Sequence, residues 1–182
     1  MGRFSIAAKQ HVSIAETYEA ELGDKEKAIQ HYEQAADYYQ GEESTSHANK
    51  CHLKVAEMSA LMERYEKSVE IYERVAKAAA DNNLLKYTAR DHLFRAGVCR
   101  LCLDVEDCKQ TLPKYEGMVP QFADSRESKL LKNLVSHIEE GNADAFTAAL
   151  QDWDAMTKFD AWFTTLFLRV KKLHLSGQDD LK

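Results

Sequence analysis

The stretch "EKAIQHYEQAADYY" (Glu26 to Tyr39) returns 40 residues later as "EKSVEIYERVAKAA" (Glu66 to Ala79), with Glu, Lys, Tyr, Glu and Ala in register. Apolar residues recur in both copies every three to four positions, which is the period of an amphipathic helix. A repeat of this length is typical of stacked helix pairs, because a single pair cannot bury its apolar face alone. The repeat therefore predicts an all-α fold.

A second recurring feature is an alanine in the segment that precedes each of these helices. Ala15, Ala56 and Ala96 lie in "IAETYEAELGD", "VAEMSALMERY" and "RAGVCRLCLDV". A small side chain lets two helices approach closely, as in tetratricopeptide arrays, where the unit is about 34 residues long. The longer period predicts longer helices in a tetratricopeptide-like, right-handed solenoid of antiparallel helix pairs.

The second half of the chain carries a looser version of the same pattern. "CKQTLPKYEGM" (108–118) predicts another second helix, and the segment from 125 to 153 predicts a further pair with its turn at Gly141-Asn142. A closing helix runs from Asp160 to about Leu173, and Trp162, Leu166, Val170 and Leu173 share one face. We expect this face to cap the stack. The predicted organisation is helical repeats over 1–120 and a carboxyl-terminal helical bundle with an acidic tail over 121–182.

Aromatic residues recur along the predicted helices. Their spacing favours packing between helices over a cofactor site. They are Tyr18, Tyr32, Tyr39, Tyr65, Tyr72, Phe94, Tyr115 and Phe146.

Composition narrows the class of protein. Seven Gly and two Pro suit a helical chain, and a net charge of −6 with a pI near 5.7 argues against nucleic-acid binding. The longest apolar run, "AWFTTLFL" (161–168), is far shorter than the roughly 20 residues of a membrane span, and "MGRFSIAAK" lacks the apolar core of a signal peptide. Four cysteines without framework spacing suit a reducing compartment. We expect a cytoplasmic protein.

Residues with catalytic or metal-binding chemistry are few. Cys99-x-x-Cys102 is the one redox-like spacing, and without a second pair it favours buried structural cysteines over a thiol- or metal-dependent enzyme. The seven histidines form no ligand pair in sequence; His47 and His52, five apart, point to different helix sides. There is no glycine-rich phosphate loop or serine nucleophile motif. We predict a binding protein, not an enzyme, without cofactor or metal.

A cation stands six residues before each of the three alanines. These cations are Lys9, Lys50 and Arg90; Lys129 follows 39 residues after Arg90, with Arg126 one turn before it. Equivalent positions of stacked repeats fall on one face, so we predict a basic row on an otherwise acidic chain. Such a row suits a long, rigid, acidic partner, because many weak contacts act together.

Several segments identify a family by resemblance. "EKAIQHYEQAADYYQGEES", "LLKYTARDHLFRAGVCRLCLD", "FADSRESKLLKNL" and "WFTTLFLRVKK", with the acidic ending that contains leucine, resemble the α/β branch of the soluble NSF attachment proteins. The similarity extends over all 182 residues. It implies a twisted sheet of antiparallel helices followed by a helical bundle. It also implies that the chain corresponds to roughly the carboxyl-terminal two-thirds of a member, starting at an internal Met.

The resemblance also implies a function. Members bind the assembled SNARE four-helix bundle, of the syntaxin and synaptobrevin type, and recruit and stimulate the AAA ATPase NSF, which disassembles it in vesicle trafficking. The family's basic inner face, which meets the acidic rod, falls by position on Arg3, Lys9, Lys50, Arg90 and Arg126. The family's membrane-touching loop lies outside this chain. Peripheral membrane association is therefore expected to be weak or absent here.

The NSF N-domains are expected at the opposite end of the chain. The matching residues are Asp104, Glu139, Glu140, Asp179, Asp180 and Leu181. The chain departs from the family pattern at Ser136, where an acid is common, and ends in Lys182 rather than Arg. The tail is thus interpreted as a docking segment. A general tetratricopeptide-like scaffold for short peptides is the alternative function that the repeat alone allows.

Overall fold

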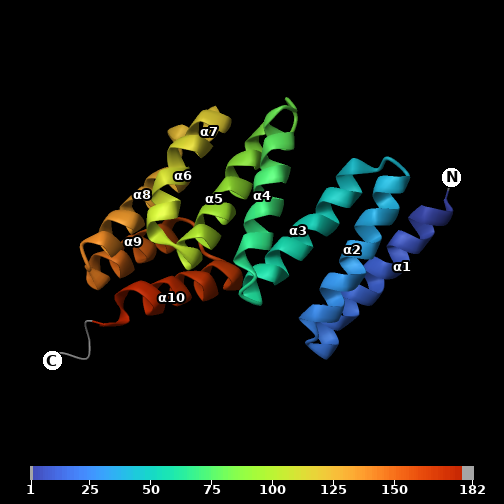
Figure 1. The fold of residues 1–182 in the computed structure, drawn as a ribbon, viewed down its shortest axis with the longest axis horizontal. Helices are drawn as coiled ribbons and strands as arrows, with labels where there is room; N and C mark the ends of the chain where they lie inside the picture. The colour runs from blue at the N-terminus through green and yellow to red at the C-terminus, as the bar shows by residue number, and fades with distance from the viewer. Residues whose placement is uncertain (1, 178–182) are drawn as a thin grey trace. The chain divides into compact units, whose positions relative to one another are not determined.

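The structure is a computed structural model that describes residues 2–177, and this part of the chain is built from α-helices with one short π-helical segment (Figure 1). The all-α stack predicted from the repeat is confirmed. The elements are α1 (Arg3–Thr17), η1 (Tyr18–Leu22), α2 (Lys25–Gly41), α3 (Thr45–Leu61), α4 (Tyr65–Ala80), α5 (Lys86–Leu103), α6 (Val105–Met118), α7 (Pro120–Ala123), α8 (Arg126–Glu139), α9 (Ala143–Met156) and α10 (Ala161–Leu175).

The chain divides into two compact units, Met1–Ile71 and Tyr72–Lys182, and the boundary falls inside α4. The first unit holds α1 to α3 and the first part of α4. The second holds the rest of α4 and α5 to α10. The division near residue 120 that the sequence suggests stays a prediction.

Turns in the first unit repeat with the sequence. Gly23 and Glu63, 40 residues apart, both adopt left-handed backbone, with φ of 63° and 64°. Asp24 then begins α2 by accepting a hydrogen bond from the backbone N–H of Lys27 at 3.1 Å. The Ser68 hydroxyl of α4 donates to the Ala56 carbonyl of α3 at 2.7 Å. A short turn makes the two helices that it joins antiparallel. Helices α1 and α3 both pack against α2 and therefore run in the same direction.

Close helix packing depends on small residues at the predicted positions. Ala15, Ala56 and Ala96 are each 0% exposed, which confirms their place between helices. Next to Ala96, a Cβ on Gly97 would lie 2.5 Å from Cδ1 of Leu131, so α5 and α8 approach closely here and a larger residue would displace the Leu131 side chain.

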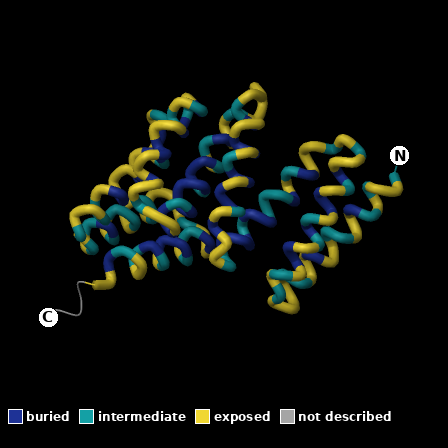
Figure 2. Tube along the Cα trace, in the orientation of Figure 1, coloured by how far each residue is buried: buried dark blue, intermediate teal, exposed yellow. Residues whose placement is uncertain are grey.

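The core of the second unit surrounds α5, which Figure 2 shows as mostly buried. Arg100 of α5 bonds Glu73 of α4 at 2.6 Å and Asp107 of α6 at 2.6 Å. The hydroxyl of Tyr115 donates to the same Glu73 at 2.5 Å. Burial and this bond to Glu73 raise the pKa of Tyr115, so the phenol remains neutral. The network fixes α4, α5 and α6 against one another.

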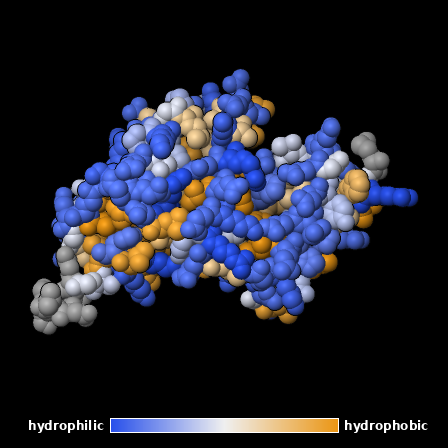
Figure 3. All heavy atoms as spheres, in the orientation of Figure 1, coloured by the Kyte–Doolittle hydropathy of each residue, from blue (hydrophilic) through white to orange (hydrophobic). Residues whose placement is uncertain are grey.

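The closing helix α10 packs on α5, as the predicted capping face requires. Trp162, Leu166 and Val170 are buried, but Leu173 is 59% exposed and Leu175 is buried in its place. The predicted apolar face therefore shifts by two residues at its end. Figure 3 shows hydrophobic surface over the region of α9 and α10, the helices that carry the exposed Met156, Leu168 and Leu173.

The periodic aromatic residues pack as predicted. Seven of the eight are buried, and Tyr18 is half-buried against the His31 ring at 5.6 Å between centroids. The burial of these seven side chains agrees with the predicted role in packing between helices.

We expect Ala96→Leu to lower the free energy of unfolding by about 1–3 kcal/mol, because the larger side chain overpacks a position with no exposed surface. Chemical denaturation monitored by circular dichroism measures this change. Ala155→Leu, at an exposed position of α9, is the matched control and should change stability by less than about 0.5 kcal/mol. Equal stability of the two variants would contradict the role given to Ala96.

Candidate functional site

The predicted cations of the first unit are exposed and without carboxylate partners among residues 2–177. Arg3 and Lys9 lie on α1, and Lys50 lies on α3. Lys54, one turn after Lys50, differs because it pairs with Glu19 at 3.0 Å. The charges of Lys9 and Lys50 thus remain free to meet an outside acid.

In the second unit the corresponding cations are held by neighbours. The Nε atom of Arg90 lies 3.6 Å from a Glu127 carboxylate oxygen. The guanidinium of Arg126 lies over the Trp153 ring, 4.3 Å from its centroid, and donates to the Thr157 hydroxyl at 3.3 Å. Lys9 and Lys50 belong to one unit and Arg90 and Arg126 to the other, so a single row through all four stays a prediction.

The three predicted acidic residues that the structure describes each have a local contact. Asp104 begins α6, where its carboxylate accepts the backbone N–H of Asp107 at 3.0 Å. Glu139 pairs with Lys109 at 3.0 Å, and Glu140 accepts a bond from the Ser136 hydroxyl at 3.3 Å. Ser136, the position without the expected acid, therefore contacts a predicted site residue. Asp179, Asp180 and Leu181 lie outside the described residues.

These acids gather at one end of the second unit. The start of α6 lies beside the end of α8, because Lys109 contacts Glu139 while Glu116 contacts Lys132 and Ser128. Near the end of α10, the His174 Nε2 atom lies 2.8 Å from the Leu101 carbonyl, close to Asp104 in the chain. The point from which the chain continues after α10 therefore lies near the acidic end.

The basic residues occupy the opposite ends of the same helices. Arg90 lies in the second turn of α5 and Arg126 is the first residue of α8, whereas Asp104 and Glu139 lie at the ends of these helices. At 1.5 Å per residue, each cation is about 20 Å along the helix axis from the acid.

The cysteines have no reactive environment. All four are free and buried. Burial raises the pKa of Cys108 to about 12 and that of Cys99 well above the ordinary value. The interpretation as buried structural residues is confirmed, and a thiolate nucleophile at Cys99 does not fit. Residues 2–177 contain no group of three metal-ligand side chains.

One pair of residues escaped the sequence analysis. His11 of α1 and His31 of α2 face each other, with their Nδ1 atoms 2.9 Å apart, and the rings stack on Tyr38 and Tyr18. A spacing of 20 residues is no helical ligand pattern, so the search for close pairs missed it. Their positions in the sequence carried a signal that could have found them. His11 and His31 are equally far from Glu21, which lies near the turn, so two antiparallel helices bring them side by side.

Comparison with known proteins identifies the family of this chain. The family model described as soluble NSF attachment protein matches residues 1–174. The chain belongs to the soluble NSF attachment protein family. This chain is similar to the alpha-soluble NSF attachment protein of Mus musculus, with 52% identity over 182 residues, which is 100% of this chain and 62% of the relative.

Other members of the family are similar over most of the chain. The beta-soluble NSF attachment protein of Bos taurus is 54% identical over 172 residues, covering 94% of this chain and 58% of the relative. A homologue of Fowlpox virus is 33% identical over 172 residues, covering 94% of this chain and 62% of the relative. The chain thus spans about three fifths of the length of these relatives. Within residues 2–177, no helix combines the length and apolar character of a membrane span.

We expect the first unit to lose stability as pH falls below about 6.5. Burial, followed by the charge of His11, lowers the pKa of His31 in the folded chain. The unfolded chain then binds more protons between the unfolded pKa of about 6.5 and the lower folded one, so acid favours unfolding. Thermal unfolding at pH 7.5 and pH 5.5 measures the difference.

The variants His31→Gln and His47→Gln test the source of this dependence. His31→Gln should reduce the change in melting temperature between the two pH values, since the titrating group is removed. His47→Gln, on the exposed face of α3, should leave it as in the wild-type chain. An undiminished change in His31→Gln would show that other groups cause the acid sensitivity.

Proposed function

We propose that this chain is an adaptor that binds assembled SNARE complexes and recruits and stimulates the ATPase NSF for their disassembly. Membership of the soluble NSF attachment protein family supports the proposal. The observation that carries it is the separation of about 20 Å along α5 and α8 between the candidate cations, Arg90 and Arg126, and the candidate acids, Asp104 and Glu139. Two partners of opposite charge can then bind without overlap.

The SNARE contact is proposed to use the basic residues named above as a set. An exposed ion pair contributes only about 0.2–1 kcal/mol and is screened by salt. Contacts in several repeats act together on one rigid rod, so their effects combine. Lys9 and Lys50 need lose no internal ion pair with the described residues, whereas Arg90 must exchange its contact with Glu127 for one with the partner.

The NSF contact is proposed to use the acidic end. Exposed carboxylates at Asp104, Glu139 and Glu140 attract a basic partner and raise its association rate. We place the tail residues Asp179, Asp180 and Leu181 in the same contact, because the described chain reaches Gly177 after α10 at this end. Burial of one leucine contributes roughly 1.5–3 kcal/mol, enough to strengthen a contact that charge alone holds weakly.

The proposed adaptor has no catalytic activity of its own and acts in the cytoplasm. It reaches membranes peripherally, through the SNARE proteins. A general tetratricopeptide-like scaffold remains the alternative. Full competition between short peptides and the SNARE bundle for Lys9 and Lys50 would favour that alternative. A protein that binds a long rod gains its affinity from many contacts along the rod, so a short peptide should compete poorly.

We expect Lys50→Glu to weaken binding of an assembled SNARE bundle by about three- to tenfold at low salt, since an attraction becomes a repulsion. Fluorescence anisotropy with a labelled bundle at two salt concentrations measures the effect. The difference between variant and wild-type chain should shrink as salt rises.

Lys25→Glu is the matched control, because Lys25 is an exposed lysine of the same unit that lies on α2, outside the proposed row. It carries the same change in net charge. Equal losses for Lys25→Glu and Lys50→Glu would reduce the row to a general charge effect and contradict the proposed surface.

For the NSF contact, Asp104 offers a pair of variants that separates charge from helix capping. Asp104→Asn keeps a good N-cap for α6, while Asp104→Ala loses it at a cost of about 1 kcal/mol. We expect both to lower the stimulation of NSF ATPase activity, and only Asp104→Ala to lower the melting temperature. Full stimulation by Asp104→Asn would remove this carboxylate from the proposed site.

A further inference from the structure

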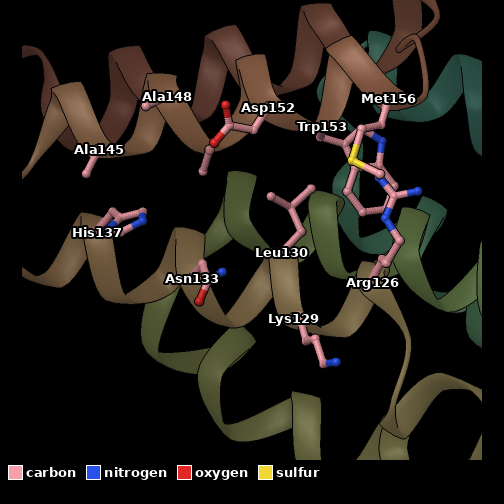
Figure 4. Close-up of a pocket in the computed structure, with 11 residues that line it drawn as sticks. Arg126, Lys129, Leu130, Asn133, His137, Ala145, Ala148, Asp152, Trp153 and Met156 are labelled. Atoms are coloured by element: carbon pink, nitrogen blue, oxygen red, sulfur yellow. The ribbon is translucent and has the colours of Figure 1, made fainter.

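An open slot runs between α8 and α9 in the second unit (Figure 4). Its volume is about 480 Å³, and it is open to solvent along its length. Figure 4 shows Leu130 pointing from α8 toward α9. The apolar lining consists of Leu130, Ala145, Ala148, Ala149, Trp153 and Met156.

The slot exists because α9 presents small residues along one side. Phe146 is the only buried residue of α9, while Ala148 is exposed and Met156 is 75% exposed. Residues from Arg126 to His137 and from Ala145 to Met156 line it, so it follows both helices for about 16 Å. It is a long groove, unlike a pocket for a small molecule.

The shape of the slot favours a helix as its occupant. An extended peptide needs partners for its backbone N–H and C=O groups, and the side chains of α8 and α9 provide few along the apolar stretch. A helix satisfies its own backbone and inserts side chains at positions i, i+3 or i+4 and i+7. These anchors span about 10 Å, which the slot accommodates.

The charge at the α8 edge specifies the flanks of that helix. Arg126 and Lys129 are exposed, and neither has a carboxylate partner among the described residues. The Arg126 guanidinium is already held by the Trp153 ring and the Thr157 hydroxyl, so little of its freedom is lost when it binds an acid. Asp152 is the one acid among the lining residues and lies on α9. A partner with carboxylates toward α8 therefore fits.

We infer that the slot is a docking site for a single acidic amphipathic helix of a protein partner. Apolar anchors of the helix lie along Ala145, Ala148 and Leu130, and its carboxylates pair with Arg126 and Lys129. An assembled four-helix bundle keeps its apolar stripes in its own core, so it cannot fill the slot in this way. The site therefore goes beyond the proposed SNARE contact, although Arg126 belongs to both.

A synthetic helical peptide with leucine at alternate third and fourth positions and glutamate on the flanking faces is the probe. We expect it to bind the 182-residue chain, as measured by fluorescence anisotropy. The same peptide with lysine for glutamate, and one with the leucines scrambled off the stripe, should each bind about tenfold more weakly. Equal binding of the three peptides would overturn the inference.

Ala148→Phe fills the slot and should weaken binding of the glutamate–leucine peptide by about tenfold. The change should not affect folding, since Ala148 is exposed. Ala155→Phe places the same ring on an exposed part of α9 outside the slot and should bind as the wild-type chain does. Undiminished binding by Ala148→Phe, or no binding by the wild-type chain, would also overturn the inference.

Two measurements separate this site from the proposed function. Ala148→Phe should retain affinity for an assembled SNARE bundle, because Ala148 lies outside the basic row. Lys50→Glu should weaken bundle binding and leave peptide binding unchanged, because Lys50 belongs to the first unit. Loss of both activities in Ala148→Phe would indicate one shared surface and contradict a separate slot.

Discussion

Close approach of helices at alanine and glycine is the constraint on which the rest of this fold depends. Ala15, Ala56 and Ala96 leave no exposed surface, and Gly97 meets Leu131 where α5 passes α8. With short turns, this packing makes α2 antiparallel to α1 and α3 in the first unit, and in the second unit it makes α6 antiparallel to α5 and α8, which run in the same direction. Equivalent helix ends then gather, so a residue's position within its repeat decides which end of the unit carries it.

That rule explains how an acidic chain can carry a basic surface. Arg90 and Arg126 lie near the starts of α5 and α8, and Asp104 and Glu139 lie at their ends, so these four candidate residues separate by sign along the two helices, although Glu127 lies at the basic end and Arg100 at the acidic end. The net charge of −6 describes neither end. The two units also differ in how their candidate cations are held. Lys9 and Lys50 have no internal acid among the described residues, whereas Arg90 contacts Glu127 and Arg126 lies on Trp153. Guanidinium groups are thereby oriented in advance, which lysine side chains are not.

Periodicity was enough to predict the helices, the turn at Gly141-Asn142 and the buried alanines, because each is a local or repeated property of the chain. It failed at the end of α10, where Leu173 is exposed and Leu175 is buried, since the tertiary contacts of the last turn decide which side faces the core. Contacts across helices were also beyond it. The His11–His31 pair and the Lys109–Glu139 ion pair join residues 20 and 30 positions apart, and only the packing of the helices brings them together. The family resemblance was enough to name the candidate acids, but it did not predict which residues contact them.

Arg126 connects the two surfaces proposed for the second unit. One guanidinium has five N–H donors in a fixed plane, and here Thr157 and the Trp153 ring already fix its orientation. A carboxylate that pairs with it in the slot between α8 and α9 removes it from the basic row, and a rod that binds the row removes it from the slot. The two occupants therefore compete for one charge even though their apolar and ionic contacts are otherwise separate. Such competition makes helix binding and rod binding thermodynamically linked, with each lowering the affinity for the other by the same factor.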